Sequence, residues 1–447
     1  MSADSQALDL LADLIARAGG AGADQADAVL VESTSLTHAQ RLGRPERLER
    51  AESEDLGLRV FVGRRQAVVS STDRSKAALK ELVERALAMA KAVPEDPHCG
   101  LAEADQLVRE VADLDICEAD EPQPEILVER ASRAEDAARA VAGVTNSEGA
   151  EASWGRSRVA LAASNGFAGT YATSRHALAV SVLAGEGLGM ERDYAFSNAV
   201  YAADLEEPEV VGLRAGERAV KRLGPRKAET GQVPVVYDPR VARGLLRHLA
   251  GAISGTAIAR GTSFLKDRLG ERIFAPAVTI VDDPHRSRGL SSKPFDGEGV
   301  AGQRRNIVEA GVLTTWLLDV RSANQLGLKT TGHAARGTSS PPSPAATNLY
   351  LEPGPVSPAE LMADIGQGFY VTELIGSGVH LVTGDYSRGA VGFWIEGGVP
   401  AYPVSEVTIA GNLVDMFQGL SAANDLEFRY GTDAPTVRVD GMTVAGR

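Results

Sequence analysis

Residues 238–263 carry the strongest pattern in the chain, and they predict a helix with a well-defined start. Asp238 can cap this helix, and Pro239 suits its first position, where a missing N–H group costs nothing. Apolar side chains recur every three or four residues, so we expect one face to be buried. That face is formed by Val241, Ala242, Leu245, Leu246, Leu249 and Ile253. An opposite basic stripe is formed by Arg240, Arg243 and Arg247. A third strip, where another backbone could come close, is formed by Gly244, Gly251 and Gly255.

The composition is that of a folded protein of two or three domains. The chain has 447 residues, of which 44% are hydrophobic and 24% charged. No apolar run approaches the roughly 18 residues of a membrane span. The first residues form an amphipathic pattern with acids in its apolar part, unlike a signal peptide, so we expect a cytoplasmic location. The net charge of −14 argues against nucleic-acid binding. Cys99 and Cys117 fit no zinc motif and are expected to be reduced.

The N-terminal half alternates helical and strand patterns. Asp73 is expected to cap the second helix, and Asn165-Gly166 is a strong hairpin turn. We expect helices at about 5–17, from 74 onward, at 125–141 and at 207–223. Strands are expected at 27–33, 56–62, 66–71, 144–153, 158–164, 167–173 and 177–183. The four strands expected between residues 144 and 183 should form an antiparallel meander with one face covered.

The C-terminal half is richer in strands. The short polar segment 224–232 is the best domain boundary, and Ala310-Gly311 is expected to turn a hairpin. Strands are expected at 233–237, 277–281, 307–309, 312–317, 370–374, 378–382, 389–396 and 399–404. Residues 330–347 show no secondary-structure pattern and predict a long loop.

These patterns predict an α+β chain of two domains. The first, 1–223, is an α/β region with an antiparallel sheet and flanking helices, and 1–93 and 122–223 are its candidate subdomains. The second, 233–447, is a β-rich, barrel-like antiparallel domain with a buried helix.

No local motif identifies an active site. The two closest histidines, His248 and His285, are 37 positions apart, so no His-pair metal motif exists. There is no G-x-S-x-G elbow, and the G-x-G-x-x-G match at 297–302 lacks a preceding strand and a following helix. Asp282-Asp283 at a strand end could pair as acid and base or could simply form a turn. A hydrolase that uses Ser377, His333 or Asp385 remains an alternative.

Several segments, in this order and spacing, resemble the TldD/PmbA family over most of the chain, and the PmbA (TldE) branch in particular. They are 245–263, 281–283, 296–303, 309–313, 347–350, 435–440 and 442–446. The resemblance implies an N-terminal α/β region and a C-terminal domain rich in antiparallel strands. It also implies one subunit of a cytosolic heterodimeric metalloprotease, whose partner would be a TldD-type protein. Such a complex acts on unfolded proteins or small peptides, in the maturation of peptide precursors and the degradation of antitoxins.

The chain departs from the family at the metal site. TldD-type subunits carry H-E-x-x-x-H on the helix described above, and this motif falls on Arg247, His248 and Ala252. Arginine cannot ligate a cation, alanine has no ligand atom, and a single histidine does not hold zinc. The TldD-type subunit also supplies a cysteine ligand from its C-terminal part, whereas this chain has no cysteine after Cys117. We therefore expect no metal and no catalytic residue here, zinc in the TldD-type partner, and no activity of the chain alone. The alternative is a homodimeric peptide-binding or scaffold protein.

Overall fold

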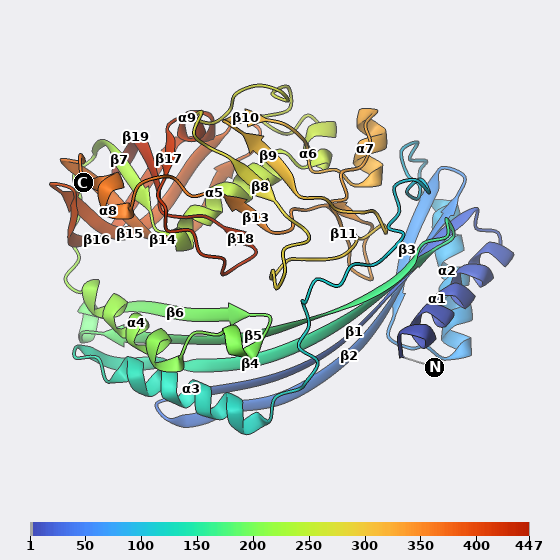
Figure 1. The fold of residues 1–447 in the computed structure, drawn as a ribbon, viewed down its shortest axis with the longest axis horizontal. Coiled ribbons are helices and arrows are strands. Elements are labelled where there is room, and N and C mark those ends of the chain that lie inside the picture. Colours follow the sequence, from blue (N-terminus) through green and yellow to red (C-terminus); the bar gives the residue numbers. More distant parts are fainter. Residues whose placement is uncertain (1–2, 447) are drawn as a thin grey trace.

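The computed structural model describes residues 3–446, and its N-terminal half is built on one antiparallel sheet (Figure 1). Six strands lie in the order β3-β2-β1-β4-β5-β6. Their bounds are β1 (Gln25–Arg41), β2 (Arg44–Val62), β3 (Arg65–Ser71), β4 (Val144–Ala163), β5 (Ala168–Ala184) and β6 (Glu191–Ala199). The hairpin turn at Asn165-Gly166 is confirmed, since it joins β4 to β5.

Four of these strands are much longer than predicted. The expected pairs 144–153 with 158–164 and 167–173 with 177–183 are single strands, β4 and β5. Strand β1 continues past Ser33 to Arg41, and the first part of β2 was not predicted. Polar residues interrupt the hydrophobic alternation here, but the backbone ladder runs on. Thr34, for example, lies opposite both Glu52 and Arg156.

Four helices cover the outer face of this sheet as two separate pairs (Figure 1). They are α1 (Ala3–Gly20), α2 (Lys76–Ala92), α3 (Pro124–Arg139) and α4 (Pro208–Lys221). The first pair buries Leu30 of β1 in one core, and the second buries Leu36 in another. Both side chains point to the same face, because they are six residues apart on a strand. The cap of α2 differs from the prediction: Ser75 caps the helix, and Asp73 accepts a hydrogen bond from the Ser75 N–H.

The C-terminal half contains a closed barrel. Strands β16-β15-β14-β7-β19 are neighbours, and pairing of β16 with β19 closes the ring. All these pairs are antiparallel except β7 with β14. The bounds are β7 (Gly231–Tyr237), β14 (Gln367–His380), β15 (Asp385–Glu396), β16 (Val399–Asn412) and β19 (Val437–Ala445), and β17 (Leu420–Ala422) pairs with β19. The α+β class and the barrel-like C-terminal domain are therefore confirmed. Strand β19 was not predicted, and the expected strands 370–374 and 378–382 are one strand, β14.

A second, five-stranded sheet lies beside the barrel, in the order β10-β9-β8-β13-β18. It comprises β8 (Ile280–Asp282), β9 (Arg305–Glu309), β10 (Val312–Leu313), β13 (Leu349–Leu351) and β18 (Thr432–Asp433). The predicted hairpin at Ala310-Gly311 joins β9 to β10. The remaining helices are α5 (Pro239–Ala252), α6 (Gly255–Ala259), α7 (Val320–Leu326), α8 (Pro358–Met362) and α9 (Leu413–Gln418), and the 3₁₀ turns are η1 (Gly187–Gly189) and η2 (Ala202–Asp204).

The segment predicted as a long loop, 330–347, contains two short strands. They are β11 (Ala334–Ala335) and β12 (Ser343–Pro344), which pair with each other. The segment is held from the N-terminal sheet as well: the Arg336 Nη1 atom lies 2.7 Å from Asp27 Oδ1, and both side chains are buried. Thr338 approaches β2 so closely that a Cβ on Gly57 would lie 2.2 Å from its carbonyl oxygen. A glycine at position 57 is therefore required by the contact between the two halves.

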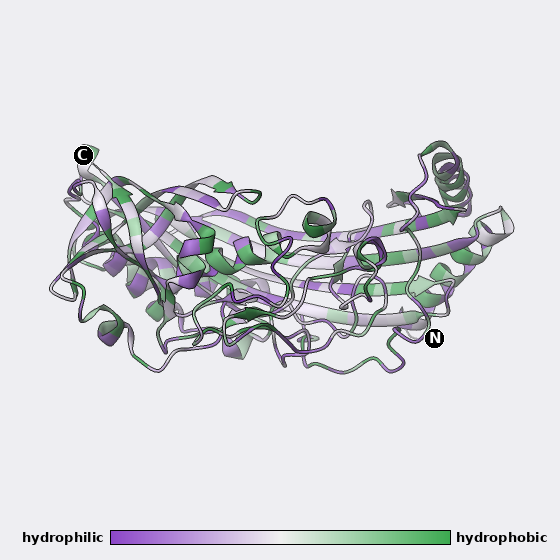
Figure 2. Cartoon of the chain, turned by 90° about the horizontal axis from the view of Figure 1, so that it is seen from above, coloured by the Kyte–Doolittle hydropathy of each residue, from purple (hydrophilic) through white to green (hydrophobic). Residues whose placement is uncertain are grey.

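The C-terminal half lies against the inner face of the N-terminal sheet, opposite the four helices (Figure 1). Figure 2 shows the long strands running along the molecule, with green stretches toward the N-terminal helices. No helix within residues 3–446 combines the length and apolarity needed to cross a membrane.

Candidate functional site

Helix α5 lies where the two halves of the chain meet, and it starts as predicted. The Asp238 side chain accepts a hydrogen bond from the Arg240 N–H, and Pro239 occupies the first turn. The apolar face is in the core of the C-terminal half, with Ala242, Leu245, Leu246, Leu249 and Ile253 each at most 3% exposed and Val241 half-buried. The opposite, arginine-bearing face is turned toward strands β5 and β6.

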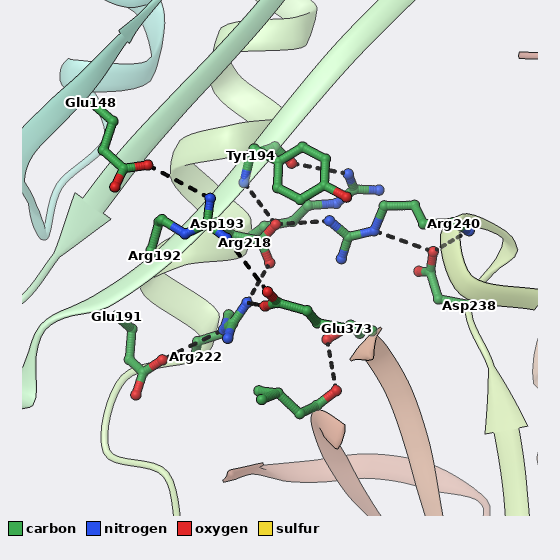
Figure 3. Close-up of polar contacts among 12 residues, drawn as sticks. Glu148, Glu191, Arg192, Asp193, Tyr194, Arg218, Arg222, Asp238, Arg240 and Glu373 are labelled. Atoms are coloured by element: carbon green, nitrogen blue, oxygen red, sulfur yellow. Dashed lines mark hydrogen bonds and ion pairs between the residues drawn. The ribbon is translucent and has the colours of Figure 1, made fainter. Parts of the chain in front are cut away.

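Arg240 anchors this helix to the N-terminal sheet (Figure 3). Its Nη1 atom lies 2.7 Å from Oδ1 of Asp193 on β6, and the two side chains are 8% and 3% exposed. Burial disfavours the charge on Asp193, but the neighbouring Arg240 guanidinium outweighs this and holds the pKa of the carboxyl below its ordinary value. Arg222 extends the network, because it contacts both Asp193 and Glu373 of β14. The network fixes α5 and β14 relative to β6.

Arg243 and Arg247 lie further along the same face of α5. The Arg243 guanidinium stacks on the ring of Tyr430, 3.7 Å from its centroid, and Arg247 is exposed. Both line a cavity of about 550 Å³ between α5 and the inner face of β5 and β6. The opposite wall includes Arg175, Tyr194 and Phe196. This cavity is large enough for a small ligand or part of a peptide.

His248 points away from the cavity, toward the barrel. Its ring meets the ring of Tyr386 edge to face, with centroids 6.0 Å apart. Burial, together with the positive charges of Arg388 and Arg247, lowers the pKa of His248 to about 4. The imidazole is therefore neutral at physiological pH, while Arg247 beside it is charged.

Ala252 is completely buried, in the core of the C-terminal half. The predicted glycine strip is only partly a contact surface. A Cβ on Gly255 would lie 2.4 Å from Ser322 Oγ, whereas one on Gly244 would meet nothing within 4 Å. A Cβ on Gly251 would lie 3.3 Å from Leu381 Cδ1. Close approach at this strip therefore occurs at Gly251, near the end of α5, and at Gly255, the first residue of α6, and at both positions it involves side chains rather than backbone.

The residues at the position of the family's zinc motif do not fit a metal. Neither Arg247 nor Ala252 has an atom that can ligate a metal ion, and His248 is a single neutral imidazole that faces Tyr386. Within residues 3–446, no three His, Cys, Asp or Glu side chains are grouped so that they could hold a metal ion.

The residues of the alternative hydrolase hypothesis have other partners. His333 is 2% exposed, with Nε2 3.1 Å from Asp282 Oδ2 and Nδ1 2.8 Å from Thr331 Oγ1. Asp385 accepts a hydrogen bond from Thr383. Ser377 lies in the exposed end of β14. Across residues 3–446 no hydrogen bond joins any two of the three.

The aspartates of the other motifs noted in the sequence hold loops in place. Asp283 accepts a hydrogen bond from the His285 N–H, and Asp282 binds the Thr347 backbone and hydroxyl. Asp296, just before the G-x-G-x-x-G match, accepts hydrogen bonds from the N–H groups of Glu298 and Val300. The turn interpretation therefore fits Asp283, whereas Asp282 is the last residue of β8 and holds the distant Thr347 and His333 in place.

The far wall of the cavity was not identified from the sequence. Arg175, Tyr194 and Phe196 occur in ordinary strand patterns, and Tyr430 follows a segment without a clear pattern. Only the fold brings them to α5, so no sequence motif could have found them.

Comparisons with known proteins agree with this architecture. A family model described as the PmbA/TldA metallopeptidase C-terminal domain matches residues 230–446, and models of the central domain and domain 1 match 117–223 and 26–90. The metalloprotease PmbA of Escherichia coli is 39% identical, over 95% of this chain and 93% of that protein. A metalloprotease PmbA homolog of Haemophilus influenzae is 36% identical, over 99% and 96% of the two chains. A crystal structure of a Bacteroides thetaiotaomicron protein described as a candidate modulator of DNA gyrase matches with a TM-score of 0.90 and 26% identity, and the match covers 98% of each chain.

Matches of this extent place the chain among peptidase-type proteins. It belongs to the PmbA/TldA metallopeptidase family, and both relatives named above carry the PmbA name. The family resemblance seen in the sequence is therefore confirmed.

Proposed function

We propose that this protein is the subunit without metal of a heterodimeric metalloprotease of the TldD–PmbA type. Zinc and the catalytic groups would reside in a TldD-type partner, and the complex would cleave unfolded proteins or small peptides in the cytoplasm. This chain alone would be inactive.

One observation carries the proposal: helix α5 lies beside an open cavity, and its residues Arg247, His248 and Ala252 do not supply a set of metal ligands. Its cavity-facing residues Arg243 and Arg247 are cationic, and their positive charges would repel a zinc ion. His248 faces Tyr386, and Ala252 is buried in the core. The fold and the cavity nevertheless suit a peptide-handling role, since extended peptides bind such proteins in clefts or along sheet edges.

The test is metal analysis combined with a peptidase assay. The purified chain, a TldD-type subunit and their mixture are each assayed for bound zinc and for cleavage of a fluorogenic unstructured peptide. We expect substoichiometric zinc in this chain, no cleavage by it alone, and chelator-sensitive cleavage by the mixture that exceeds that of the partner alone. Chelator-sensitive proteolysis by the pure chain would overturn the proposal.

The second candidate is a homodimer that captures peptides without supporting hydrolysis. The same open cavity favours it, because binding requires no metal. A chain that self-associates and adds nothing to the activity of the TldD-type subunit would establish this alternative.

A further inference from the structure

The charged side chains that line the cavity beside α5 are all cationic. They are Arg175 of β5 and Arg243 and Arg247 of α5, and we call this group the arginine chamber. Among residues 3–446, no Asp or Glu lines the cavity. Arg243 and Arg247 are four residues apart on a helix, so their side chains are neighbours. Arg175 faces them from the sheet.

These three arginines have no acidic partner in the part of the chain that the structure describes. Other arginines around α5 do: Arg240 pairs with Asp193, and Arg222 with Asp193 and Glu373. Arg243 instead donates from Nε to the Arg240 carbonyl oxygen and stacks on Tyr430. The contrast is informative because acids outnumber bases by 60 to 46 in this chain. Three cations around one cavity in an acidic protein form a place where an external anion is favoured.

The chemistry of the walls narrows the choice of anion. A guanidinium group matches the two oxygens of a carboxylate in a planar fork. The aromatic rings of Tyr194, Phe196 and Tyr430 offer apolar surface next to those forks. A long polyanion would be repelled by the net charge of −14 outside the cavity. A short peptide bearing a carboxylate satisfies all of these conditions.

We propose that the arginine chamber binds a carboxylate of the peptide substrate, either an acidic side chain or the C-terminal carboxylate. This rests on the peptide-handling function proposed above and assigns it a preference for acidic peptides. The chamber would hold one end of the peptide by its charge, while the partner subunit would carry the hydrolytic chemistry.

The test is binding of fluorescent octapeptides to the full-length chain alone, followed by anisotropy. One peptide contains two Glu residues near its C-terminus, and the matched peptide contains Gln at those positions. Each is made with a free and with an amidated C-terminus. We expect peptides with the Glu side chains, peptides with a free C-terminal carboxylate, or both groups, to bind about tenfold more tightly than the amidated Gln peptide, which has neither. Their affinity should fall as the salt concentration is raised. Retention of tight binding by the amidated Glu peptide identifies the side chain as the source, and tight binding of the free-acid Gln peptide identifies the terminus.

Substitutions test whether the preference for acidic peptides depends on the arginine chamber. Arg247→Gln and Arg175→Gln lie on different elements and should each abolish most of the tenfold preference. Arg247→Lys keeps the charge but loses the fork, and should retain part of it. Arg260→Gln, an exposed arginine that does not line the cavity, is the control and should change nothing. Circular dichroism and thermal melting verify that each variant is folded.

The proposal is overturned if folded wild-type protein binds all four peptides equally, or if Arg260→Gln weakens binding as much as Arg247→Gln. Its failure is distinguishable from failure of the proposed function. If the complex cleaves peptides without any preference for acidic ones, only the proposal for the arginine chamber is refuted. If the chain binds acidic peptides but adds nothing to the activity of a TldD-type subunit, only the proposed role in proteolysis is refuted.

Discussion

Arg240 of helix α5 and Asp193 of strand β6 form a buried ion pair, 2.7 Å between Nη1 and Oδ1, across the boundary between the two halves of the chain. Replacing Asp193 by Asn leaves the Arg240 charge buried without its closest counterion. We expect this variant to lose about 3–5 kcal/mol of unfolding free energy, measured by chemical denaturation. The matched control is Glu151→Gln, which removes a surface partner of Arg47 whose side chain is about half exposed, and it should cost less than about 1 kcal/mol. Equal losses in the two variants would contradict the role of Arg240 as an anchor.

Glu298 predicts a pH dependence of stability. This buried carboxyl accepts a hydrogen bond from the Val320 N–H, and burial raises its pKa to about 8, with Arg59 opposing the shift and Asp296 adding to it. The folded chain therefore keeps this proton to higher pH than the unfolded chain does, and the contribution to stability falls as the pH rises from about 4.5 to about 8.

Glu298→Gln should remove this part of the pH dependence, which denaturation at several pH values within that window would show. The exposed Glu81→Gln serves as the control and should leave the slope unchanged. A slope unaffected by Glu298→Gln would mean that the carboxyl is ionised in the folded protein.

His248 predicts a dependence of the opposite sign. Burial beside Arg388 and Arg247 lowers its pKa to about 4, whereas the ordinary value is 6.5. The unfolded chain therefore binds this proton first, and the stability contribution is lost as the pH falls from about 6.5 to about 4. We expect the His248 ring signals in NMR, assigned by their absence in His248→Gln, to stay constant between pH 7 and pH 6. Titration of those signals within that range would show that the ring is solvated.

Two helical glycines should respond to alanine with opposite signs. A Cβ on Gly212 of α4 would lie 2.1 Å from the Ala134 carbonyl oxygen of α3, so Gly212→Ala must push the two helices apart. We expect a loss of about 1–3 kcal/mol, as for other overpacked sites. A Cβ on Gly244 of α5 would meet nothing within 4 Å, so Gly244→Ala should gain about 0.5–1 kcal/mol from helix propensity. Thermal and chemical denaturation of both variants test the pair, and a stabilising Gly212→Ala would refute the close helix contact.

The sequence predicts elements well where local chemistry decides them. Helix α5 begins at its Asp238 cap, and the Ala310-Gly311 turn joins β9 to β10. The sequence predicts poorly those strands that form only because they pair with a neighbouring strand. The first eleven residues of β2 are all exposed and mostly charged, so no hydrophobic alternation marks them, and only the ladder to β1 makes them a strand. Strand β19 is likewise defined by the barrel it closes.

The candidate site shows the same division. Arg243 and Arg247 were visible as part of a basic stripe, because helical spacing alone puts them on one face. Arg175 and Tyr430 come from segments 68 positions before and 187 positions after Arg243, and only tertiary structure brings them to the same cavity.

The length of strand β1 has a consequence for how the N-terminal half opens. Leu30 belongs to the core under α1 and α2, and Leu36 to the core under α3 and α4, yet one continuous hydrogen-bonded ladder connects them. The strands under one helix pair therefore cannot separate without also breaking the hydrogen-bonded ladder under the other pair. Amide hydrogens at residues 31–35 are therefore expected to exchange with solvent only when the whole sheet opens, although few apolar groups surround them. The two cores would then act as one cooperative unit, even though a 31-residue stretch, 93–123, separates their helices in the sequence.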